Sequence, residues 1–173
     1  MAISLYSATV STYLQALPKV AALIDKAEAH CGENGLGDDA LSAASLAPDQ
    51  WNFARQVSST CHHSAGAIEG VRAGVFMPDL DPAPTDFASL KAHVAKSIAL
   101  LEAVDPGELD AIQDRDMRFE FGTRRMDFTV EGFLLSFSIP NFFFHAATAF
   151  SVLRNQGLPL GKMDYLGMPR LKG

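Results

Sequence analysis

Apolar residues recur at three- and four-residue spacing through most of this chain, and that period predicts amphipathic helices. The first helix is expected from Ile3 to about Ala29. It contains Pro18, which lacks a backbone donor, so we expect a bend near residues 14–18. The glycine-dense segment 31–37 is expected to end this helix. A one-turn helical piece is expected around residues 39–45.

A second helix is expected from Pro48 and Asp49 to about Gly70, because proline and an acidic residue are favoured in a first helical turn. Residues 77–84 hold three prolines and two aspartates, which predicts a linker. Thr85 is then expected to cap a third helix, whose apolar stripe begins at Phe87 and includes Leu101.

The apolar period changes from helical spacing to strict alternation in residues 119–130, around the pair Gly122-Thr123. This alternation predicts a short two-stranded hairpin. After it, Ser138 is expected to cap a last long helix that begins at Pro140 and is ended by Gly157.

These elements predict an all-α fold, an antiparallel four-helix bundle with a short β-hairpin insertion before the last helix. The chain has 173 residues, 48% of them hydrophobic, which is enough to bury one sizeable core. We therefore expect residues 1–173 to form a single domain.

Charge and targeting signals narrow the classes of partner. With 14 basic and 20 acidic residues the net charge is −6, so no nucleic acid and no anionic membrane surface is expected as a partner. The N-terminus lacks the basic and apolar regions of a signal peptide, and nowhere do eighteen apolar residues run together. Cys31 and Cys61 are interpreted as reduced thiols. A soluble, cytoplasmic protein is expected.

Candidate chemistry centres on His145, which lies inside an almost wholly apolar helix. A buried imidazole needs a hydrogen-bond partner or a metal, because an unpaired polar group in a core costs roughly 1–3 kcal/mol. Asn141 lies one turn earlier on the same face, where its amide can reach the imidazole or a shared ligand. The neighbouring Phe142, Phe143, Phe144 and Phe150 are expected to be core residues.

The second helix offers two adjacent histidines. Helical geometry directs His62 to solvent and His63 to the border where another helix packs, so His63 is the better candidate. The alternative is structural: His63 would bond to a side chain, and His145 would be a core histidine bonded to a backbone carbonyl. Cys61 falls on the buried stripe, where a thiol has a normal or raised pKa. Motifs of nucleotide-binding loops, serine hydrolases and zinc proteases do not occur.

Several segments together resemble an uncharacterised bacterial family of the DinB/YfiT-like superfamily of four-helix bundles. They are Leu46–Asp49, Ala54–Val57 with Cys61–His63, Pro140–His145, Leu153–Gly157 and Gly161–Gly167. The resemblance implies a homodimer, and in many members a three-histidine metal site with one histidine on the second helix and an HxxxH pair on the fourth. It also implies, for some members, metal-dependent thiol-transferase or hydrolase activity.

Transferred to this chain, the resemblance makes His63 and His145 metal ligands and leaves Asn141 where the other histidine of the pair would stand. An amide oxygen is a poorer ligand than imidazole for zinc or nickel, so the site would be weak, open, or completed by a group such as Asp164.

Two hypotheses about function therefore stay open. The first is a divalent-metal-binding protein with hydrolase or thiol-transferase activity, in which Asn141 completes the shell around the metal. The second is a non-catalytic, homodimeric module that has lost the metal site and binds a small-molecule ligand or a protein.

Overall fold

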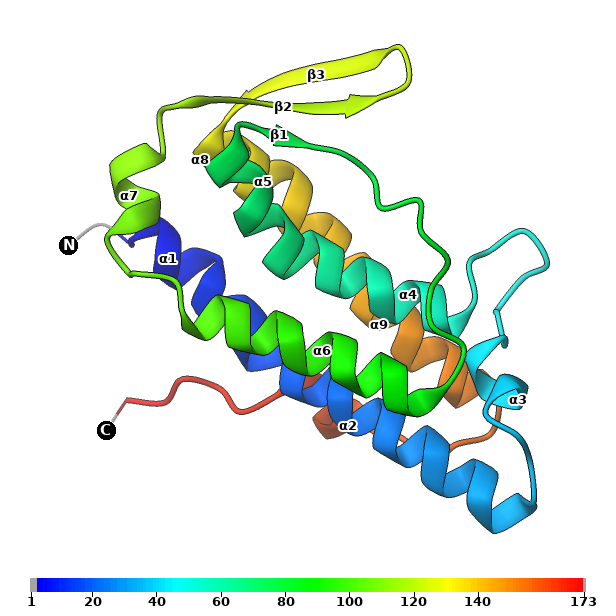
Figure 1. The fold of residues 1–173 in the computed structure, drawn as a ribbon. Coiled ribbons are helices and arrows are strands. Elements are labelled where there is room, and N and C mark those ends of the chain that lie inside the picture. Colours follow the sequence, from blue (N-terminus) through cyan, green and yellow to red (C-terminus); the bar gives the residue numbers. More distant parts are fainter. Residues whose placement is uncertain (1–2, 173) are drawn as a thin grey trace.

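The computed structural model describes residues 3–172 and is mainly helical (Figure 1). The helices are α1 (Leu5–Ala8), α2 (Val10–Asn34), α3 (Asp39–Ser42), α4 (Phe53–Cys61), α5 (Ala67–Ala73), α6 (Phe87–Glu102), α7 (Glu108–Ile112), α8 (Val130–Phe133), α9 (Ile139–Asn155) and α10 (Lys162–Leu166). Two π-helical turns, η1 (His62–Gly66) and η2 (Leu134–Ser138), join α4 to α5 and α8 to α9. The strands are β1 (Val75–Phe76), β2 (Asp116–Phe121) and β3 (Arg124–Thr129).

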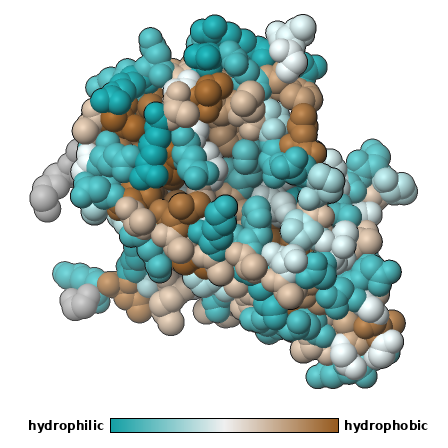
Figure 2. All heavy atoms as spheres, viewed as in Figure 1, coloured by the Kyte–Doolittle hydropathy of each residue, from teal (hydrophilic) through white to brown (hydrophobic). Residues whose placement is uncertain are grey.

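The core lies between the long helices, with α2 packed on α6 and α4 packed on α9. Its largest fully buried side chains include Tyr13, Phe53, Phe87, Phe133 and Phe142. Each such side chain stabilises the fold by roughly 1.5–3 kcal/mol when it leaves water. On the face shown in Figure 2, hydrophobic residues appear in groups between hydrophilic ones.

Two helices begin later than the sequence predicts, because a different side chain caps each of them. Asn52 caps α4, where its Oδ1 accepts a hydrogen bond from the Arg55 backbone N at 2.9 Å. The predicted start at Pro48 is therefore wrong. Asp86 rather than Thr85 caps α6, since its Oδ1 accepts from the Ser89 backbone N at 2.7 Å.

The last helix begins ten residues before the predicted start at Pro140. It runs without a break from Val130 to Asn155, and Thr129 caps it. The π-helical turn η2 ends at Ser138, two residues before Pro140, and its wider turn accommodates the missing backbone donor. By length and composition alone this helix could also cross a membrane, a property that it shares with core helices of soluble proteins.

The predicted hairpin is confirmed, but it belongs to a larger sheet. Strands β2 and β3 are antiparallel from Asp116↔Thr129 to Phe121↔Arg124, and Gly122 at the turn has a positive φ of 58°. Strand β1 pairs in parallel with β2, so the sheet has three strands and mixed direction. The all-α prediction is thus corrected to a mainly helical fold with a small mixed sheet. A two-residue strand is too short to show an alternating pattern.

Candidate functional site

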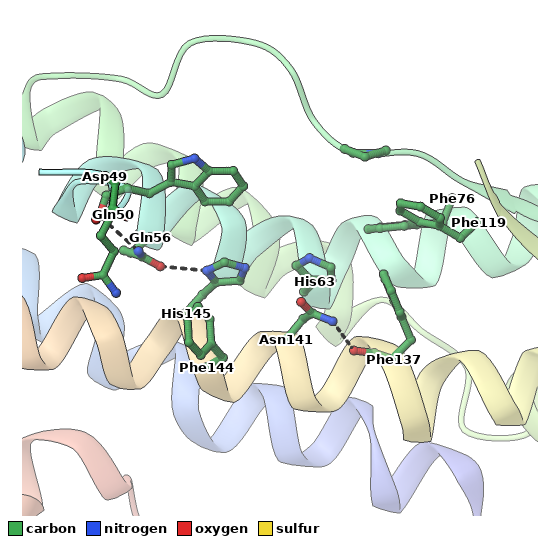
Figure 3. A pocket seen from close by; sticks show the side chains of 12 residues that line it. Asp49, Gln50, Gln56, His63, Phe76, Phe119, Phe137, Asn141, Phe144 and His145 are labelled. Atoms are coloured by element: carbon green, nitrogen blue, oxygen red, sulfur yellow. Dashed lines mark hydrogen bonds between the residues drawn. The ribbon is translucent and has the colours of Figure 1, made fainter. Parts of the chain in front are cut away.

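A cavity of about 450 Å³ lies beside the helices α4 and α9 and their π-helical turns, beneath the segment that follows β1 (Figure 3). We call it the histidine–aromatic pocket. Its walls combine aromatic rings with imidazole and amide groups. The lining residues are Asp49, Gln50, Trp51, Gln56, His63, Phe76, Pro78, Phe119, Phe137, Asn141, Phe144 and His145.

His145 is buried in this wall, with 6% of its surface exposed. Its Nδ1 lies 2.7 Å from Oε1 of the buried Gln56, whose Nε2 donates in turn to the Trp51 carbonyl at 3.1 Å. Burial, with a smaller contribution from the positive charge of Arg55, lowers the pKa of His145 to about 4. The imidazole is therefore neutral at pH 7. Its partner is a side-chain amide, not the backbone carbonyl of the structural alternative.

His63 lies next to His145, with the ring centroids 5.5 Å apart and the ring planes 19° from parallel. Its Nδ1 is buried and has no hydrogen-bond partner among the described residues. The expected side-chain bond of the structural alternative is therefore absent at this nitrogen. Burial, followed by the nearby His145 and His62, lowers the pKa of His63 to about 3. The two predicted histidines thus come together as neutral groups, and their role as metal ligands stays a prediction.

Asn141 lies on the same wall of the pocket. Its Nδ2 donates to the Phe137 carbonyl, one turn back, at 2.7 Å. This bond fixes the amide and leaves Oδ1 as its acceptor, which is the atom that a metal or a hydrogen-bond donor would use.

The segment that follows β1 passes over the pocket (Figure 3). Pro78 of this segment is one of the lining residues. His62 was expected in solvent, but its Nε2 lies 2.8 Å from the Met77 carbonyl and its ring packs on Phe76. The overlying segment therefore leaves His62 half-buried.

Asp164, the residue suggested to complete a metal site, does not line the pocket. It lies on α10, which packs against α2, and its carboxylate accepts from Lys26 Nζ and from the Gly161 backbone N, both at 2.7 Å. Its charge is thus already paired elsewhere, and it cannot join His63 and His145.

The aromatic rim of the pocket was missed from the sequence. Trp51 is 52% exposed and stacks on the His145 ring at 5.7 Å, with the Arg55 guanidinium 5.0 Å from the indole centre. Phe144 was expected in the core, but it is 58% exposed because it falls on the pocket side of α9. The sequence signal that could have indicated this rim is the chain's one tryptophan, Trp51, which lies directly before the helix cap Asn52.

The donor set suits a metal only weakly. No group of three or more His, Cys, Asp and Glu side chains that could hold a metal occurs within residues 3–172. The pocket offers two neutral imidazoles and the Asn141 Oδ1, which fits a weakly held divalent ion with open positions.

The cysteines behave as the sequence predicts. Both Cys31 and Cys61 are free and buried. Burial raises the pKa of the Cys61 thiol to about 12, so this group is a thiol and not a nucleophilic thiolate at pH 7.

Comparison with known proteins gives a family and a fold. The family described as "Domain of unknown function (DUF1993)" matches residues 5–166. The crystal structure of a DinB family member protein from Shewanella denitrificans is 28% identical in sequence, with a TM-score of 0.81 over 98% of this chain and 95% of that one. Both findings confirm the DinB-like resemblance. No curated protein matches the chain.

Proposed function

The chain belongs to the DUF1993 family of DinB-like proteins, and from that premise we propose that it binds a small molecule in the histidine–aromatic pocket. One observation carries the proposal: a cavity of about 450 Å³ combines aromatic walls with a pair of neutral imidazoles. Small-molecule sites have this character, being concave, mostly apolar and supplied with a few placed polar groups.

The exposed rim supports the same conclusion. Trp51 and Phe144 line the pocket, and more than half of the surface of each is exposed to water. A ligand that covered them would remove apolar area from solvent at about 25 cal/mol per Å². Asp49 is the one lining residue with a formal charge, so the pocket favours uncharged ligands over anions.

Binding is tested with a mixture of small aromatic fragments and NMR spectra of the ¹⁵N-labelled protein. We expect shifts in resonances of the lining residues. Phe144→Ala should weaken binding of the best fragment at least tenfold, because it removes an exposed wall without opening the core. Met163, also exposed at 65% but outside the pocket, supplies the control Met163→Ala. Equal loss in both variants, or no shift with any fragment, would refute the proposal.

A second candidate function is binding of a divalent metal, zinc or nickel. It is favoured by the Gln56 amide, which holds the Nδ1 of His145 as outer partners of metal-bound histidines do. His63 and His145 would hold the ion, and Asn141 Oδ1 would complete its shell. A bound metal would supply a Lewis acid that activates water or a thiol, consistent with a hydrolase or thiol transferase.

The metal proposal predicts about one equivalent of zinc or nickel per chain by isothermal titration and elemental analysis of untagged protein. His63→Phe and His145→Phe should each lose it. His30→Ala is the matched control, since His30 lies on α2 outside the pocket. Metal retained by both pocket variants would exclude these residues as ligands.

We also infer the finer architecture and setting. The packing of α2 on α6 and of α4 on α9 supports an antiparallel four-helix bundle forming one domain. A homodimer and a cytoplasmic location remain our proposals, supported by the resemblance and by the two free cysteines. Light scattering of the purified chain would test the dimer.

A further inference from the structure

The protonation of His145 follows from a chain of hydrogen bonds. The Trp51 carbonyl can only accept, so the Gln56 amide must direct its NH₂ group toward Trp51. Its Oε1 therefore faces His145 and accepts from Nδ1–H. A neutral imidazole carries one proton, so His145 Nε2 is a bare acceptor. Figure 3 shows this second nitrogen on the side of the ring that faces His63.

The protonation of His63 follows from what its Nδ1 lacks. This nitrogen is sealed from solvent and has no partner among the described residues. An N–H sealed away from every acceptor would lose its hydrogen bond to water with no replacement. Placing the proton on Nε2 avoids that loss and gives this nitrogen an N–H donor outside the sealed position.

An acceptor nitrogen and a donor nitrogen are therefore carried by two neighbouring rings, whose centroids are 5.5 Å apart and whose planes are 19° from parallel. One hydroxyl group can both donate and accept, and rings at this separation are close enough for one oxygen to bond to both. We propose that the pocket selects an uncharged aromatic alcohol, whose hydroxyl donates to His145 Nε2 and accepts from His63 Nε2–H. This inference rests on the proposed ligand-binding function and adds the chemical class of the ligand.

The rest of the pocket matches that class. Trp51, Phe137 and Phe144 offer aromatic surface for a flat ring, and the volume of about 450 Å³ admits more than one ring. Carboxylates and phosphates are disfavoured, because no lysine or arginine lines the pocket and Asp49 does. Arg55 is engaged outside the lining, where its guanidinium donates to the backbone carbonyls of the segment above the pocket.

The test uses a matched pair of probes, 4-ethylphenol and its methyl ether, in which a methyl group replaces the hydroxyl hydrogen and removes the donor. We expect the phenol to bind the wild-type protein at least tenfold more tightly in NMR titrations. In His145→Phe the aromatic shape stays and the acceptor is lost, so the preference should fall to about threefold or less. His30→Ala should keep the full preference.

A second readout needs no variant. Two-bond ¹H–¹⁵N correlation spectra of the imidazoles distinguish the tautomers, and we expect Nδ1–H for His145 and Nε2–H for His63. In Gln56→Leu the His145 signals should move toward a tautomer mixture, which loss of packing alone would not produce.

Three results would overturn the inference. One is equal affinity for the phenol and its ether, and another is the Nε2–H tautomer of His145 in the wild-type protein. The third is failure of both probes to bind while other fragments still shift the pocket resonances, which would leave the proposed binding function intact. If no fragment shifts those resonances, the binding function itself fails.

Discussion

Gln56 holds the His145 imidazole in its orientation in the pocket wall. The residue is 1% exposed, and its amide bonds both the His145 imidazole and the Trp51 carbonyl. We expect Gln56→Leu to lower the free energy of unfolding by about 1–3 kcal/mol, because it leaves the buried Nδ1–H of His145 without an acceptor. Urea unfolding followed by circular dichroism measures this change.

The double variant Gln56→Leu/His145→Phe controls for lost packing. Replacing both partners of a buried hydrogen bond costs less than removing one, so the two losses should be clearly less than additive. Strict additivity would mean that Gln56 and His145 do not interact energetically.

The two pocket histidines also predict how stability depends on pH. Their folded pKa values of about 3 and about 4 lie below the ordinary value of 6.5, so the unfolded chain takes up protons first as the pH falls. Each histidine therefore lowers the stability of the fold as the pH falls from about 6.5 toward its own folded pKa. From about pH 7 to about pH 5 we expect a loss of roughly 2–4 kcal/mol from both groups together. His145→Phe should show a shallower loss, and a stability that rises toward pH 5 would contradict the assignment.

At the scale of elements, two π-helical turns meet across the core. Ser138 in η2 donates through Oγ to the carbonyl of His63 in η1 at 2.6 Å. The hydroxyl of Tyr13 on α2 lies 2.8 Å from the same Oγ, and since that oxygen already donates to His63, Tyr13 is the donor. Three helical segments are thus tied together directly behind His63.

Ser138→Ala should therefore destabilise the protein by about 1–3 kcal/mol, because it leaves the buried Tyr13 hydroxyl without its partner and removes the bond to the His63 carbonyl. Ser151→Ala is the matched control, since Ser151 Oγ donates only to its own helix, to the Ala147 carbonyl. We expect its effect to stay within about 0.5 kcal/mol. If both variants lowered the melting temperature equally, Ser138 would not link the three helical segments.

Sequence reasoning failed where contacts between distant segments or competing caps decide the structure. Apolar periodicity found the long helices and the hairpin, because burial of one face is a regular, local signal. His62 was assigned to solvent because its own helix turns it outward, and the pattern of a single helix does not show that the segment after β1 lies against it. Caps at Asn52 and Asp86 compete with equally suitable neighbours, which only the folded geometry decides.

The candidate site divides in the same way. His145 and Asn141 could be found because polar groups on an apolar helix stand out from their neighbours. Phe76 and Phe119 could not, since they come from two strands that lie far apart in the sequence. Their convergence depends on the parallel pairing of β1 with β2, for which a two-residue strand leaves no pattern.

At the scale of the whole molecule, the C-terminal segment closes the fold along α2 (Figure 1). Tyr165 on α10 packs against Phe150, and the Leu166 carbonyl accepts from Gln15 Nε2 at 3.2 Å. Gly167 follows with a positive φ of 74°, directly against the backbone of Gln15. None of these residues lines the histidine–aromatic pocket, so the stability of the fold and binding at the pocket should be separable.

Gly167→Ala tests that separation. A Cβ at this position would collide with the Gln15 carbonyl oxygen, and the positive φ disfavours alanine. The C-terminal segment must therefore move away from α2. We expect a loss of about 1–3 kcal/mol in urea unfolding and faster hydrogen exchange in α10. Affinity of the pocket for its best fragment should stay within about twofold, because the pocket's walls come from α4, α9 and the strands. A similar loss of affinity would show that the C-terminal segment and the histidine–aromatic pocket are energetically coupled.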